Sequence, residues 1–182
     1  MTETVSGNQR ARLAALVAQG DALQFANPAW RRELATWMHT RRAGDGLVVP
    51  RLGAALTRLM VSHSNLGTRI GKRDAALTNT APLVMVIGTS IDDDHAWLTA
   101  GRALQRLLLT AVTVGIQAGF ANQPCQVSTL RPVLEDLLER QHPQLVLRLG
   151  FPPSLPSPTP RRDPAEVLTV AATRITPDAQ TP

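Results

Sequence analysis

Apolar residues recur at helical spacing in several stretches of the chain, and the longest such stretch lies near its middle. In this stretch they repeat every three or four positions and so share one face of a helix: Trp97, Ala100, Leu104, Leu107, Leu108, Ala111, Val112 and Gly115. Asp92, Asp93 and Asp94 supply N-cap candidates and negative charge at its start. Gly115, Gly119 and Pro124 end the helix and leave Phe120–Gln123 as a loop. The same stripe is also typical of an ordinary core helix.

Other helices are predicted on both sides of this stretch. The clearest start is Asn27 followed by Pro28, an N-cap and first-turn pair, with a helix running to about Arg41. The remaining predicted helices are Gln9–Gln24, Pro50–His63, and a short helix capped by Ser128 or Thr129 that runs to about Gln141. Residues 64–79 are mostly polar and predict a loop.

Two short apolar runs predict buried strands. Leu83–Thr89 is continuous and bounded by Pro82, whereas Leu145–Leu149 is interrupted only by Arg148. Strand, helix, loop, helix and strand in this order predict an α/β or α+β layer arrangement. Residues 151–164 contain six prolines, which predict an extended arm. We therefore expect one domain over residues 1–150 and a C-terminal arm over residues 151–182.

Composition narrows the classes of function. A chain of 182 residues has room for one domain with a substantial core. Cys125 is the sole cysteine, which excludes an intramolecular disulfide and a multi-cysteine metal site, and a lone cysteine is typically a small apolar residue. The four histidines lack the spacing of a helical metal site, so no metal is expected. Without a signal peptide pattern or a membrane-length apolar run, the sequence predicts a cytoplasmic protein and no membrane partner.

Positive charge is concentrated in the first part of the chain. Residues 1–73 contain eleven Lys or Arg and four Asp or Glu, against eight and ten in the remainder. All but one of these cations are arginines, which suit forked contacts with phosphate or carboxylate, although a solvated face has the same pattern. No zinc-finger spacing, ribonucleoprotein motif or clear helix-turn-helix accompanies them, so nucleic acid is not expected as the partner.

Three segments, in this order, resemble the nitroreductase-like FMN flavoproteins. They are FANPAWRRELATWM, then APLVMVIGTSIDDDHAWLTAGRALQRLLLTAVTVGIQAGFANQP, and finally PQLVLRLGFPP with PTPRRDPAEVL. Within that family, the chain is most similar to a double-length branch described as NAD(P)H nitroreductases. In this branch the pattern lies in the second half, so the chain resembles that C-terminal module standing alone.

The resemblance implies an α+β fold with a central mixed sheet flanked by helices, which binds FMN between two modules. It places the loop after the long helix beside the flavin ring, and here that loop contains Ala121, Asn122 and Gln123. Backbone N–H donation to the reactive ring nitrogen would favour reduced flavin. It also implies that Arg161 and Arg162 contact the FMN phosphate.

The chain departs from the family in one respect. Family members carry an early motif with a serine between arginines that binds the phosphate, and Arg10 and Arg12 do not form it. The second module would come from a homodimer or from a complementary half-module. The implied activity is electron transfer from NAD(P)H to a nitro compound, quinone or similar acceptor. The alternatives are an inert flavin-binding or storage protein, and a half-module that acts only as an interaction partner.

Overall fold

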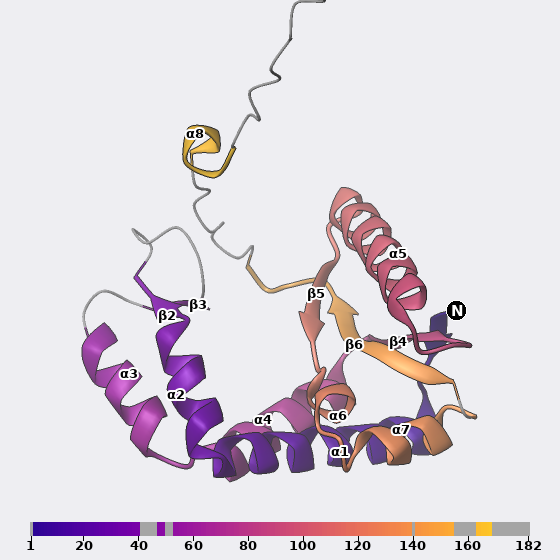
Figure 1. The fold of residues 1–182 in the computed structure, drawn as a ribbon. Helices are drawn as coiled ribbons and strands as arrows, with labels where there is room; N and C mark the ends of the chain where they lie inside the picture. Colours follow the sequence, from indigo (N-terminus) through magenta and orange to yellow (C-terminus); the bar gives the residue numbers. More distant parts are fainter. Residues whose placement is uncertain (1, 41–46, 50–52, 140, 155–162, 169–182) are drawn as a thin grey trace, which may run out of the picture.

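The computed structural model describes residues 2–40, 47–49, 53–139, 141–154 and 163–168. It has an α+β architecture around a four-stranded sheet of order β1-β4-β6-β5 (Figure 1). The strands are β1 (Thr2–Thr4), β4 (Leu83–Thr89), β5 (Gln117–Phe120) and β6 (His142–Gly150). The two predicted strands are thus confirmed as β4 and β6, the central pair.

Neighbouring strands of this sheet are antiparallel, so the predicted mixed sheet is wrong for the described strands. The reason lies in the position of β6. The long helix connects β4 to β5, and such a crossover leaves these two strands parallel to each other. Because β6 inserts between them and runs opposite to both, no parallel pair forms in this sheet.

The predicted long helix is confirmed as α5 (Asp94–Thr113), and it covers one face of the sheet (Figure 1). Asp93 is its N-cap, with a carboxylate oxygen that accepts from the Ala96 N–H at 2.7 Å. Ala100 and Ala111 are buried on the sheet with the strand residues Ile87, Leu147 and Leu149. Two members of the predicted stripe, Trp97 and Val112, are instead 51% and 59% exposed.

The other face of the sheet is covered by α1 (Gly7–Ala26) and α7 (Arg131–Leu137). Seven apolar residues expected to face inward on the two helices are buried in one cluster with Val84, Val86 and Val146 of the sheet: Leu13, Leu16, Val17, Leu130, Leu134, Leu137 and Leu138. Leu23, which the same apolar pattern places inward, is instead 43% exposed. The predicted Ser or Thr cap of α7 is wrong, because its N-cap is Leu130, which makes no side-chain cap bond.

The predicted loop over residues 64–79 is wrong, because α4 (Gly67–Thr80) lies there and packs along α1. Its buried residues are Gly67, Gly71 and Thr78 instead of an apolar stripe. A Cβ atom at Gly71 would lie 2.6 Å from the backbone oxygen of Ala18, so the two helices cross in close backbone contact. Small residues make this close approach possible. Because they are not large and apolar, the helix has no apolar periodicity by which its sequence would predict it.

A smaller unit projects beside the end of α1 (Figure 1). It contains α2 (Pro28–Thr36), α3 (Ala54–His63), and the paired strands β2 (Met38–His39) and β3 (Leu47–Val48). The predicted cap is confirmed, because Asn27 Oδ1 accepts from the Ala29 N–H at 2.9 Å. The helix ends at Thr36 and does not reach Arg41, because the chain enters β2 at Met38.

The remaining described helices are short: α6 (Gln123–Gln126) and α8 (Pro164–Val167). Most of the predicted C-terminal arm lies outside the described residues. Over the part of the chain that is described, no helix is both long enough and apolar enough to cross a bilayer.

Candidate functional site

A groove of about 380 Å³ lies at the β5 edge of the sheet, and its β5 wall precedes the predicted ring loop in the chain. Three segments line it: Gln117–Gly119 of β5, residues 148–152 at the end of β6, and residues 77–82 at the end of α4. Leu77, Pro82, Leu149, Phe151 and Pro152 give the groove a largely apolar wall. We call it the Arg148 groove, after its one charged side chain.

Arg148 pairs with Gly119 in the β5–β6 register. Its Nε atom is buried, and no atom of its side chain meets a hydrogen-bonding or ionic partner within the described ranges. A Cβ atom at Gly119 would lie 3.2 Å from Nη2 of Arg148, so the glycine leaves space for the guanidinium. A half-buried arginine without a carboxylate can accept an anion through forked, charge-assisted hydrogen bonds.

The predicted ring loop continues directly from β5 and is held by β6. The Ala121 N–H donates to the Val146 carbonyl at 2.9 Å, and Asn122 Oδ1 accepts from the Val146 N–H at 2.8 Å. Ala121 itself is only 1% exposed. The Oδ1 atom of Asn122 is therefore engaged within the protein.

The side chain of Gln123 is also turned inward. Its Nε2 donates to Asp21 Oδ1 of α1 at 3.1 Å and lies 3.5 Å from Asp74 Oδ2 of α4. The backbone N–H groups of Asn122 and Gln123, by contrast, have no acceptor in the described part of the chain. Hydrogen-bonding groups at this loop without a partner among the described residues thus include two backbone donors.

Asp21 is 3% exposed, and its burial raises the pKa of this carboxyl to about 6. The hydrogen bond from Gln123 lowers the pKa, and the nearby Asp74 carboxylate raises it. The acidic group that anchors the ring loop is consequently protonated over part of the range in which proteins work. The sequence did not predict this role of Asp21, because a single aspartate in a helix belongs to no recognisable motif.

Cys125 packs against the core cluster beneath the loop, and burial raises the pKa of its thiol to about 12. A thiol with so high a pKa is a poor nucleophile and a poor redox group at neutral pH. Among the residues that the structure describes, no cluster of His, Cys, Asp and Glu could hold a metal ion. Arg161 and Arg162, the predicted phosphate ligands, lie outside the described residues.

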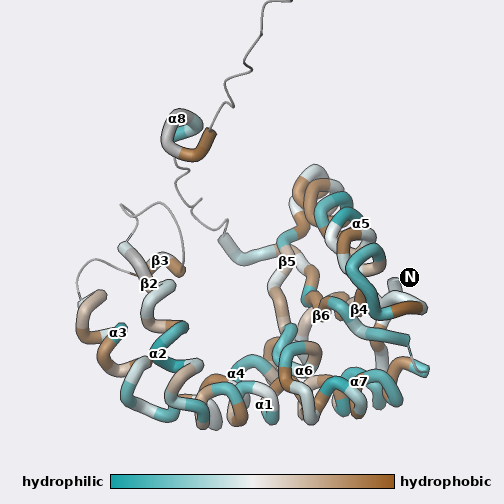
Figure 2. The backbone as a smooth tube through the Cα atoms, in the orientation of Figure 1, coloured by the Kyte–Doolittle hydropathy of each residue, from teal (hydrophilic) through white to brown (hydrophobic). Residues whose placement is uncertain are grey.

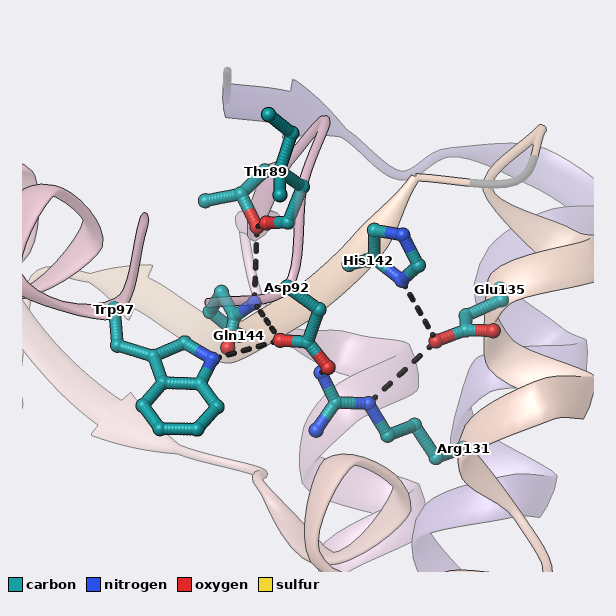
Figure 3. A network of polar contacts seen from close by, with 8 residues as sticks. Thr89, Asp92, Trp97, Arg131, Glu135, His142 and Gln144 are labelled. Carbon is teal, nitrogen blue, oxygen red and sulfur yellow. Dashed lines mark hydrogen bonds and ion pairs between the residues drawn. The ribbon is translucent and has the colours of Figure 1, made fainter. Parts of the chain in front are cut away.

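A polar network fixes the start of α5 to β6 and α7 (Figure 3). Asp92 Oδ1 accepts from Trp97 Nε1 at 2.7 Å and from Gln144 Nε2 at 2.9 Å, while Oδ2 pairs with Arg131 at 2.8 Å. The hydrogen bonds from Gln144 and Trp97 lower the pKa of Asp92, with a smaller contribution from Arg131. This network holds the long helix on the sheet.

Hydrophobic and hydrophilic residues alternate along α5 (Figure 2), and its exposed positions include both kinds. Several large side chains along the helix are more than half exposed: Trp97, Leu98, Leu109 and Val112. Val114 follows on the same chain segment at 59% exposure, and Phe151 beside the groove is 74% exposed. The exposed apolar side chains thus form one group at each end of α5, with exposed Arg102, Gln105 and Arg106 between them, and each group is a candidate interaction surface.

Arg148 is the main site residue that sequence reasoning did not assign. Its signal was present as the single charge inside an otherwise apolar strand. A charge in a central strand requires a partner or a polar environment, and such a residue is a candidate for binding.

Comparison with known proteins gives distant relatives. The chain is 28% identical to the uncharacterized Mycobacterium tuberculosis protein Rv3127 over 182 residues, which cover 95% of this chain and 52% of that protein. It is 28% identical over 170 residues to a protein of the same organism named "Putative NAD(P)H nitroreductase Rv3131", covering 86% and 48%. No protein-family model matches the chain. The chain is thus a distant homologue of these proteins and spans about half of their length.

Proposed function

We propose that the chain is an FMN-binding, nitroreductase-like oxidoreductase that transfers electrons from NAD(P)H to a nitro compound, quinone or similar acceptor. The distant homology to a protein named as a nitroreductase supports this class. The observation that carries the proposal is the guanidinium of Arg148, which has no partner among the described residues and lines a groove together with β5. The loop that follows β5 carries the N–H groups of Asn122 and Gln123, which have no acceptor among the described residues. When bound, FMN supplies the hydride-accepting ring.

The residues present fit such a cofactor. Arg148 would hold an anionic part of the flavin, and the apolar wall of the groove suits a flat ring. The backbone N–H groups of Asn122 and Gln123 would donate hydrogen bonds to the cofactor. Ala121 contributes a close, buried backbone without a large side chain. Arg161 and Arg162 remain proposed phosphate ligands.

A second module would complete this site. The groove is open along the edge of the sheet, and the exposed apolar surface of α5 requires a cover. The relatives are about twice as long as the chain, which leaves room in them for a second module. We propose that a second copy of this chain, or a complementary half-module, supplies it here.

The first experiment is a visible spectrum and mass analysis of the purified protein, before and after adding FMN. Bound yellow flavin that oxidises NADPH in the presence of a nitroaromatic supports the oxidoreductase. Bound flavin without turnover supports an inert flavin-binding protein. Absence of flavin bands even with added FMN overturns the cofactor, and a stable hetero-complex would then favour an interaction module.

The second experiment tests the role of Arg148. The variant Arg148→Met keeps an unbranched side chain similar to the aliphatic stem of arginine and removes the charged guanidinium. We expect its Kd for FMN to rise about 10-fold to 100-fold, because a hydrogen bond to a charged group contributes about 1.5–3 kcal/mol. Arg12→Met at an exposed site of α1 is the control, and its Kd should not change. Equal affinities for both variants would remove Arg148 from the site.

A further inference from the structure

Two buried oxygen atoms lie on one hydrogen-bonded pair of side chains, and neither has a donor. They are Asp21 Oδ2 and Gln123 Oε1, which lack partners among the described residues. Their sister atoms are already joined, because Gln123 Nε2 donates to Asp21 Oδ1 at 3.1 Å. Buried oxygens without a donor are rare, because each costs the free energy of its lost hydration.

One proton satisfies both oxygens. A protonated carboxyl group has one O–H donor, so Oδ2–H of Asp21 can donate to Oε1 of Gln123. The carboxylic acid and the carboxamide then exchange two hydrogen bonds in a closed ring. We propose that Asp21 is a positioning residue in its protonated form, and that this cyclic acid–amide pair fixes the loop 121–123 against α1.

The surroundings favour the protonated form. Asp74 of α4 faces the pair with a carboxylate, and α6 contributes the neutral Gln123 and the neutral thiol of Cys125. Lys72 and Arg73 of α4 are exposed, and neither forms an ion pair with Asp21. Burial therefore acts on Asp21 without a compensating cation, in agreement with its raised pKa of about 6.

The backbone holds the two side chains together. A Cβ atom at Gly20, the residue before Asp21, would lie 2.6 Å from the Cβ of Gln123. The start of α6 therefore rests directly on α1. Gln123 has little freedom to turn its amide elsewhere. When Asp21 ionises, its carboxylate oxygen therefore faces Oε1 of Gln123 without a proton between them. The two acceptors repel each other, which weakens the contact between the loop and α1.

The consequence for a cofactor rests on the proposed function. The backbone N–H groups of Asn122 and Gln123 would be held most firmly below pH 6 and loosened above it. The pair itself is a property of the protein without flavin. Its test therefore uses the full chain in the absence of FMN, so that failure to bind flavin leaves the result unaffected.

The experiment is an NMR titration of side-chain carboxyl carbons and backbone amides between pH 3 and pH 8. Asp21, identified from its absence in Asp21→Asn, should titrate with a midpoint near 6. The amide signals of Ala121 and Gln123 should shift with the same midpoint. In Asp21→Asn, whose amide can make both hydrogen bonds without titrating, these shifts should disappear. Asp136→Asn at an exposed site of α7 should leave them unchanged.

Three results would overturn the proposal. One is a titration midpoint near pH 4 for Asp21, which means that its carboxyl group is already ionised at pH 6. Another is loop amides that do not respond while Asp21 titrates. The third is an unchanged loop transition in Asp21→Asn. If that variant fails to fold, the first two results on the wild-type chain still decide the matter.

Discussion

The carboxylate of Asp92 lies 2.8 Å from the guanidinium of Arg131, and this ion pair joins the segment before α5 to α7 near the end of β4 and the start of β6 (Figure 3). Asp92 also accepts hydrogen bonds from Trp97 and Gln144, so one side chain connects three elements. The core beneath α5 is built partly from alanines, which bury little area each. The network therefore has a large share in holding this helix on the sheet.

Replacement of Asp92 should loosen α5. We expect Asp92→Ala to lower the free energy of unfolding by about 1–2 kcal/mol, a moderate value because the site is partly exposed to solvent. Asp94→Ala is the matched control, since its carboxylate only faces the positive end of the helix, and should cost about 0.5 kcal/mol. Urea unfolding of both variants measures the difference, and equal midpoints would contradict the role of the network.

The same carboxylate gives an acid dependence with a definite sign. Its pKa is lowered in the folded state, so the unfolded chain binds the proton more tightly. The stabilisation is present above the unfolded pKa of 3.8 and is lost as the pH falls through the lower folded value. The stability difference between wild type and Asp92→Asn should therefore shrink below pH 4, as measured by thermal unfolding across pH 2.5–6.

The crossing of α1 and α4 should tolerate no side chain at Gly71. A methyl group there would meet backbone atoms of Ala18 at 2.6 Å and 3.0 Å, and these cannot rotate away. We expect Gly71→Ala to destabilise the protein by about 2–3 kcal/mol. Gly101→Ala on α5 meets nothing within 4 Å and should instead stabilise by about 0.5–1 kcal/mol. Urea unfolding of the two variants under identical conditions measures whether the free energy of unfolding falls for Gly71→Ala and rises for Gly101→Ala.

Apolar patterning predicted the elements that bury apolar side chains. The strands β4 and β6 and the helices α1, α5 and α7 were all indicated by it, because their inward residues are mostly Leu, Val, Ile and Ala. It failed for α4, where glycine replaces the apolar stripe, and for β5, a four-residue edge strand of sequence QAGF. It also misjudged Trp97, because hydropathy alone does not distinguish an exposed apolar side chain from one in the core.

The candidate site was predictable only in part. The loop predicted at Phe120–Gln123 is only partly right, because β5 separates it from α5, Phe120 ends β5 and Gln123 begins α6. The inward orientation of the Asn122 and Gln123 side chains depends on β6 and α1, which are distant in sequence. Asp21 and Gln123 are 102 residues apart, and no local pattern connects them. Long-range partners of this kind require the folded chain.

The thiol of Cys125 should be protected in the folded protein. With a pKa of about 12, almost none of it is thiolate at pH 8, whereas the unfolded chain has the ordinary value of 9.0. Alkylation by iodoacetamide should therefore be at least ten times slower in the native protein than in 8 M urea. Stability should also fall as the pH rises from 9 toward 12, because the unfolded state then loses the proton first. Native alkylation as fast as in urea would contradict the burial of this thiol.

The exposed face of α5 should mediate association with a second copy of the chain. Leu98 and Leu109 are 71% and 64% exposed, and a buried charge at either position would be costly in an apolar interface. We expect wild type to sediment at about twice its chain mass of 19.6 kDa, and Leu98→Glu with Leu109→Glu to sediment at the chain mass with unchanged far-ultraviolet circular dichroism. Leu56→Glu on α3 is the control: its side chain is similarly exposed at 60%, and the dimer should persist. A wild-type monomer at all concentrations, with or without FMN, would refute self-association and leave a complementary half-module as the proposed second wall of the groove.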